Sequence, residues 1–254
     1  MYRQQIKENN FFDAYFNSFL EQNERRLNLL KSGQVKSERI LWFKKSSLDI
    51  LLNFIIANYT AGKTKKEIEL IKVIDHLNDS WNSEVTKLNY NDNFYNQYPL
   101  SNFDQMLWML SLGYLLDIPN EDFKKVVEVI DRDGVKDYLF EFIIRAKLDD
   151  REPITEESYK KFFGVPKVFE KLRQAITETD KSKAEKLVEE FITKDWYRNH
   201  KDAGWYNSHK SKHDTYFGYW SFETAAVVKI MGLDDSSFID CQYYPKDLVH
   251  SENC

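Results

Sequence analysis

Residues 37–61, SERILWFKKSSLDILLNFIIANYTA, decide the fold class, because they contain neither glycine nor proline and are strongly apolar at their centre. Such a run is too long for a strand and favours a buried helix. Ser37 is placed to cap its first turn, and Gly62 follows its end, where a left-handed residue commonly closes a helix. The stretch therefore predicts one long, largely buried helix.

The segments on either side predict two further long helices. Over residues 6–30 apolar side chains recur at spacings of three and four until Gly33, as on one face of a helix. Residues 64–88 open with Thr64 and Glu67, which have the spacing of a capping box. The chain thus begins with three helices.

The rest of the chain continues the helical pattern. Helices are predicted over residues 103–115, 120–130, 138–143, 158–163, 166–176, 182–192 and 221–231. Residues 89–101 indicate a loop rich in Asn and Tyr, and residues 195–219 a long irregular segment rich in aromatic residues. We expect an all-α fold, a multi-helix bundle or stacked helical hairpins, with an N-terminal helical domain (1–118) and a C-terminal helical domain (119–254) packed as one unit.

Composition narrows the class of protein. Only 8 Gly and 5 Pro occur in 254 residues, which disfavours a glycine-rich nucleotide-binding sheet. The net charge of −5 argues against direct nucleic-acid binding. The two cysteines, Cys241 and Cys254, suggest neither a disulfide framework nor a metal site. With no apolar leader or membrane-spanning stretch, we expect a cytoplasmic protein with no membrane partner.

Residues 57–64, ANYTAGKT, resemble a relaxed phosphate-binding loop, but Ala57 stands where the first glycine should be. A phosphate loop also has to follow a strand, and the preceding residues predict a helix. Helix capping explains Gly62 and Thr64 separately, so we reject nucleotide binding.

Three histidines in the irregular segment raise the alternative of a metal site. His209 and His213 would share a face of a helix, and His200, Asp195, Asp202 and Asp214 lie nearby in sequence. However, no glutamate stands between the two histidines as a general base, and Lys210 and Lys212 disfavour a dication. We expect no metal and no cofactor, and a structural or partner-contact role for the histidines.

The densest feature of the chain is its aromatic content between residues 196 and 244. Tyr and Trp dominate the energetics of protein interfaces, but they also fill cores, and both roles stay open here. We expect Trp220 to be buried and some tyrosines to lie near the surface. Ser221 is placed to cap a helix, and Glu223 lies in the first turn of that helix. We expect Glu223 to complement the helix dipole or to form a structural hydrogen bond, and not to act in catalysis.

Three strings near the C-terminus carry a resemblance to a known family. They are GYWSFETAA (218–226), GLDDSS (232–237) and YYPKDL (243–248). Together they resemble the PoNi family of bacterial immunity proteins, and residues 59–67 with the helices around them look like the helical domain that precedes this region in the family.

The resemblance implies an antidote that binds a PoNe-type DNase toxin and blocks it, without catalytic residues of its own. An acidic inhibitor would be steered to a basic DNA-binding surface, and aromatic anchors would slow its dissociation. From charge and position, the predicted partner-binding residues are Trp205, Tyr206, His209, His213, Tyr216, Tyr219, Glu223, Asp234, Asp235, Asp240 and Tyr243. A second acidic set is Asp149, Asp150 and Glu152. Two alternatives remain, a metal-dependent hydrolase that uses the histidines and a helical scaffold without a toxin partner.

Overall fold

A computed structural model describes residues 3–4, 6–7, 11–152, 165–213 and 215–250, and it confirms the all-α prediction. Among these residues the only strands are two short ones in a single hairpin. The chain forms two compact units, one made of residues 1–86 and 207–218 and the other of residues 87–206 and 219–254. The division into 1–118 and 119–254 stays a prediction. The helix predicted over 158–163 lies outside the described residues.

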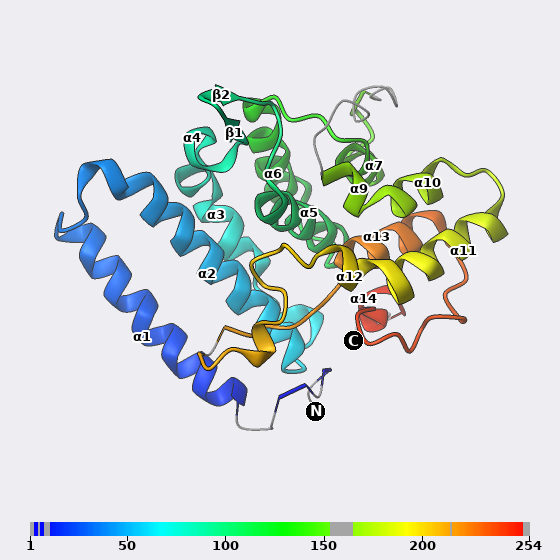
Figure 1. The fold of residues 1–254 in the computed structure, drawn as a ribbon, viewed down its shortest axis with the longest axis horizontal. Helices are drawn as coiled ribbons and strands as arrows, with labels where there is room; N and C mark the ends of the chain where they lie inside the picture. The colour runs from blue at the N-terminus through cyan, green and yellow to red at the C-terminus, as the bar shows by residue number, and fades with distance from the viewer. Residues whose placement is uncertain (1–2, 5, 8–10, 153–164, 214, 251–254) are drawn as a thin grey trace. The chain divides into compact units, whose positions relative to one another are not determined.

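The first unit consists of helices and connecting turns (Figure 1). Its helices are α1 (Phe11–Lys31), α2 (Ile40–Thr60), α3 (Leu70–Ser80) and α4 (Ser83–Thr86), with 3₁₀ turns at Ser37–Arg39, Lys65–Glu67 and Ser208–Lys210.

Helix α2 is the centre of the first unit and packs against α1, α3 and α4. Its buried face includes Leu52 and Ile55, and its Phe54 ring stacks on Phe19 of α1 at a centroid distance of 3.8 Å. The late segment 207–218 is tied to this unit by a hydrogen bond of 2.7 Å from the Thr60 hydroxyl to the Phe217 carbonyl. The predicted long, buried helix therefore organises its unit.

The prediction of a single helix over residues 64–88 is wrong. The helix breaks at Trp81, whose backbone is extended, and a new one-turn helix starts at Ser83. Asn82 explains the break, because its side-chain oxygen accepts a hydrogen bond from the Glu84 amide at 2.9 Å and so caps the second helix. The capping box at Thr64 and Glu67 does form, but it opens a 3₁₀ turn.

The second unit contains the hairpin and the remaining helices. They are β1 (Asn89–Tyr90), β2 (Asn93–Phe94), α5 (Leu100–Leu115), α6 (Asn120–Asp133), α7 (Tyr138–Lys147), α9 (Val165–Val168), α10 (Glu170–Thr177), α11 (Lys181–Glu190), α12 (Trp196–Asn199), α13 (Phe222–Met231) and α14 (Lys246–His250).

Helices α5 and α13 form the core of the second unit and pack against each other. Both are buried along most of their length, as expected for helices that are apolar on all sides. Gly113 of α5 lets α6 come close, because a Cβ atom there would lie 2.8 Å from a ring carbon of Phe123. Helices α6, α7 and α10 surround this pair, and α10 packs against α11 (Figure 1).

The hairpin turns tightly between its two short strands. Asn89 pairs with Phe94, and Tyr90 pairs with Asn93. The two turn residues, Asn91 and Asp92, both have positive φ (51° and 60°), as a type I′ turn requires and as asparagine and aspartate tolerate. Side chains that follow one another along a strand point to opposite faces, so Tyr90 and Phe94 lie on opposite faces of the hairpin.

The prediction that residues 195–219 are irregular is partly wrong. A π-helical turn, Phe191–Asp195, continues α11 directly into α12, so helix persists to Asn199. Beyond it the described residues up to 219 are irregular, apart from the 3₁₀ turn at residues 208–210. The short helix α14 lies beyond the last helix predicted from the sequence, at residues 221–231. No helix in the described ranges combines the length and the apolar character that crossing a membrane requires.

Candidate functional site

A buried polar network joins three distant parts of the second unit. Asp104 of α5 accepts a hydrogen bond of 3.1 Å from the indole N–H of Trp205 and lies 3.3 Å from Nε2 of His200. Nδ1 of His200 is 2.6 Å from the carbonyl oxygen of Trp196. His200 and Asp104 are each about 1 % exposed, so these contacts are shielded from water. The network fixes the segment after α12 against α5.

Glu223 extends the network from α13. Its Oε1 accepts hydrogen bonds of 2.6 Å from the Trp196 indole and from the Ser221 hydroxyl, while Oε2 has no hydrogen-bond partner among the described residues. Burial raises the pKa of Glu223 to about 7, although the hydrogen bond from Ser221 acts in the opposite direction and lowers it. Glu223 thus has the structural hydrogen bonds expected from the sequence, in a wholly buried position.

His200 carries a raised pKa despite its burial. Burial alone would lower the pKa of this imidazole, but attraction to Asp104 and hydrogen bonds to Asp104 and to the Trp196 carbonyl outweigh it. The ring packs against Trp205 and Phe169, at centroid distances of 5.1 and 5.3 Å. The imidazole is therefore a core group and not an accessible acid or base.

Aromatic rings surround this network. Trp196 stacks on Trp205 at 5.3 Å, and Tyr197 stacks on Tyr243 at 5.0 Å with an interplanar angle of 8°. Tyr206 lies 4.6 Å from Tyr197. Most of the rings fill the core, whereas Tyr197, Tyr206 and Tyr243 are only half-buried. Trp220 is buried, as predicted.

The predicted partner-binding residues divide between the two units. The second unit brings together Trp205, Tyr206, Tyr219, Glu223 and Tyr243, of which Trp205, Tyr219 and Glu223 are buried.

His209, His213 and Tyr216 belong to the first unit. Tyr216 is buried and donates a hydrogen bond of 2.7 Å to Gln4, while His209 is half-buried and His213 is exposed. Burial and the neighbouring lysines Lys210 and Lys7 lower the pKa of His209. Within the described ranges, no three His, Cys, Asp or Glu side chains gather closely enough to hold a metal ion, and Asp214 lies outside those ranges.

The predicted acidic contacts of the tail differ in their exposure. Asp234 and Asp240 are exposed, and Asp240 pairs with Lys246 at 2.6 Å. Hydrogen bonds from Ser236 lower the pKa of Asp234. Asp235 is buried and accepts a hydrogen bond of 2.7 Å from the Tyr244 hydroxyl, with His250 also at 2.7 Å. Asp149, Asp150 and Glu152 are exposed.

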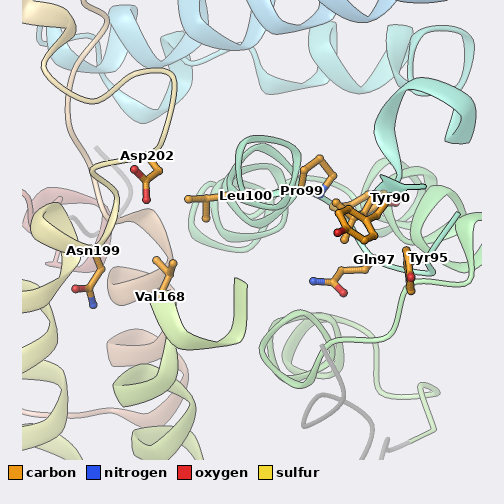
Figure 2. Close-up of a pocket in the computed structure, with 10 residues that line it drawn as sticks. Tyr90, Tyr95, Gln97, Pro99, Leu100, Val168, Asn199 and Asp202 are labelled. Atoms are coloured by element: carbon orange, nitrogen blue, oxygen red, sulfur yellow. The ribbon is translucent and has the colours of Figure 1, made fainter. Parts of the chain in front are cut away.

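The second unit also contains a pocket that sequence reasoning missed. Its volume is about 610 Å³, and it lies between the hairpin and the segment that follows α12. Its lining residues are Leu88, Tyr90, Tyr95, Gln97, Tyr98, Pro99, Leu100, Val168, Asn199 and Asp202. Figure 2 shows Asn199, Asp202 and Val168 on one side, Tyr90, Tyr95 and Gln97 on the other, and Leu100 between them. The density of tyrosine in the polar loop 89–101 was the sequence signal for this pocket.

The pocket combines apolar walls with one charge. Asp202 is its only charged lining residue, it is exposed, and no ion pair joins it to another described residue. Concave sites with apolar walls and a few polar groups are typical binding sites. Asn199 and Asp202 flank His200, so the buried network holds this side of the pocket in place.

Comparison with known proteins gives a family and a fold. The profile of the PoNe immunity protein (PoNi) N-terminal region matches residues 5–128, and the profile of the PoNi C-terminal region matches residues 135–248. The crystal structure of protein PA2201 from Pseudomonas aeruginosa is similar, with 16 % identity and a TM-score of 0.60 over 98 % of this chain and 89 % of that one. No curated protein matches the chain. The likeness to PA2201 shows the fold alone.

Proposed function

Because this chain belongs to the PoNi family of immunity proteins, we propose that it binds and neutralises one cognate PoNe-type nuclease toxin through a protein–protein interface. The observation that carries the proposal is the coverage of the family profiles, which together span nearly the whole chain. The inhibition is stoichiometric and involves no turnover. We place this action in the cytoplasm, where the DNA that the toxin attacks is found.

The charge of the chain supports a basic partner. A nuclease has to attract a polyanion, so it presents lysines and arginines at its DNA-binding surface. The immunity protein carries a net charge of −5, with Asp234 and Asp240 exposed on its tail. Opposite charges accelerate the encounter of two proteins. Fast association matters for an inhibitor of this kind, because it has to reach the toxin before the toxin reaches DNA.

The half-buried rings supply the matching apolar contact. Tyr206 and Tyr243 have their inner faces packed against other aromatic rings, so they lose little side-chain entropy when a partner covers their outer edges. Trp205, Tyr219 and Glu223 lie behind them and act as support. His209, His213 and Tyr216, in the other unit, remain predicted contacts.

The test is protection of cells together with a titration. The adjacent gene is cloned as the candidate toxin and expressed with and without the immunity protein, and the purified nuclease is then titrated with it. We expect rescue of growth, co-purification, and loss of DNA cleavage near one equivalent. Growth arrest despite good expression of the immunity protein, with no co-purification, contradicts the proposal. Inhibition that grows with time at substoichiometric amounts contradicts the absence of turnover.

A further inference from the structure

We propose that the pocket between the hairpin and the segment after α12 takes a short stretch of the toxin in which a cationic side chain adjoins apolar ones. This inference rests on the proposed function and names the part of the surface that recognises the partner. It is carried by the composition of the pocket, by the position of Asp202, and by the buried network behind it.

The volume of the pocket sets the size of what it binds. At about 610 Å³ it falls in the range of cavities that hold drug-sized ligands, of about 300–1,000 Å³. This exceeds one side chain and suits a stretch of a few residues. Leu88, Pro99, Leu100 and Val168 supply apolar walls, and burying apolar side chains against them is the main favourable term.

The single carboxylate sets the charge of the bound stretch. Asp202 has no ion pair with a described residue, and the carboxamide of Asn199 lies on the same side of the pocket. A guanidinium or ammonium group gains charge-assisted hydrogen bonds there. Tyrosine rings on the other side attract the edges of aromatic residues or a second cation. A basic nuclease surface offers such side chains, whereas an acidic segment would meet repulsion.

The pocket is pre-organised on the side of Asp202. The Trp205 indole and the His200 imidazole, which follow and precede Asp202 in the chain, are both held by Asp104. Anchoring at two points restricts the loop between them before binding. A partner therefore loses less affinity to the ordering of this loop.

The test compares variants with matched controls in the same protein. Tyr90→Ala removes a ring that lines the pocket, and Phe94→Ala removes a ring from the opposite face of the same hairpin, the two being 65 % and 53 % exposed. Asp202→Asn neutralises the pocket carboxylate, and Asp79→Asn neutralises an exposed aspartate of α3 in the other unit. All four side chains are exposed, so melting temperatures should stay close to that of the unsubstituted protein.

The measurement is calorimetric titration of each variant with a nuclease-inactive form of the candidate toxin from the adjacent gene. We expect Tyr90→Ala and Asp202→Asn each to raise Kd about tenfold, and the two controls to change it less than about twofold. Amide exchange should slow over residues 88–100 and 199–202 in the complex.

The outcomes separate the two proposals. If the unsubstituted protein does not bind the toxin, the proposed function fails. If it binds and the four variants bind equally well, with no slowing of exchange at the pocket, the function stands and the pocket inference is overturned. If Asp202→Lys binds as tightly as the unsubstituted protein, the bound stretch is not cationic, and the inference is overturned in that part.

Discussion

The guanidinium of Arg173 on α10 donates a hydrogen bond of 2.5 Å to Asp137 at the start of α7, and both side chains are buried, with exposures of 0 % and 1 %. The other carboxylate oxygen of Asp137 accepts hydrogen bonds from the amides of Leu139 and Phe140. One carboxylate therefore caps α7 and neutralises a buried cation. The two helices are fastened through a single side chain.

Substitution of Asp137 by alanine should destabilise the protein strongly. The change removes the carboxylate that pairs with the buried Arg173 guanidinium, and breaking a buried ion pair typically costs about 3–5 kcal/mol of unfolding free energy. The control is Asp180→Ala, because Asp180 caps α11 through the amides of Ser182 and Lys183 but is exposed, and losing a cap costs about 1 kcal/mol. Urea unfolding measures both. Equal losses in the two variants would contradict the view that the buried pair is the larger contribution.

Gly113→Ala should lower stability, although alanine is the better helix former. The new Cβ would lie 2.8 Å from the buried ring of Phe123 and 3.3 Å from Ile118, and overpacking a core costs about 1–3 kcal/mol. This exceeds the helix-propensity gain of about 1 kcal/mol. Gly204→Ala is the control, because a Cβ there meets nothing within 4 Å. Thermal unfolding that ranks Gly113→Ala at or above the unsubstituted protein would show that α6 can move away at little cost.

The buried carboxyl of Glu223 should make stability fall as pH rises. Its pKa is 4.5 in the unfolded chain and about 7 in the folded protein, so across this window the folded state keeps a proton that the unfolded state releases. The loss amounts to roughly 3 kcal/mol between the two pKa values. The raised pKa of His200 acts in the same direction, since its contribution is present below pH 6.5 and is lost as pH rises through the folded pKa.

Glu223→Gln isolates this effect, because an amide oxygen can still accept the hydrogen bonds of Trp196 and Ser221 but carries no charge. We compare the melting temperature of the variant with that of the unsubstituted protein at each pH. We expect this difference, variant minus unsubstituted protein, to be more positive at pH 8 than at pH 5. Calorimetry at several pH values measures the difference. Parallel profiles would mean that Glu223 does not hold the proton.

The exposed acids of the tail should control the rate of association more than the lifetime of the complex. Replacing Asp234 and Asp240 by asparagine together should slow association with the toxin by about three- to tenfold at low salt and weaken its dependence on salt. Glu121→Gln with Glu128→Gln changes the net charge equally on exposed positions of α6. Stopped-flow measurements at two salt concentrations distinguish the pairs. Equal slowing by both would indicate a net-charge effect and no particular role for the tail.

The long helices could be predicted from the sequence, because their spacing and their glycine stops act locally. Gly134 and Gly232 end α6 and α13 in the left-handed conformation that commonly closes a helix. The break at Trp81 could not be read in this way, because the apolar spacing continues through it and one asparagine side chain decides it.

The candidate site was less accessible to sequence reasoning. The aromatic density between residues 196 and 244 indicated the right region, but which rings are buried depends on helices distant in the chain. Asp104 shows this clearly: it lies within an apolar helix and meets His200 and Trp205 only in the folded unit. The pocket likewise combines loop 88–100 with Val168, Asn199 and Asp202, which no local pattern connects.

The π-helical turn at Phe191–Asp195 lets the helix hold one residue more than a regular α-helix between the same ends. A π turn accommodates more residues than an α turn, and successive residues of an α-helix are rotated by about 100°. The wide turn absorbs the rotation of the extra residue, so the Trp196 indole still reaches Glu223 and His200 still reaches Asp104. Deleting one residue there, such as the exposed Thr193, would therefore restore a regular helix and leave these buried contacts in place, so a one-residue gap at this point in an alignment would be compatible with an unchanged interior.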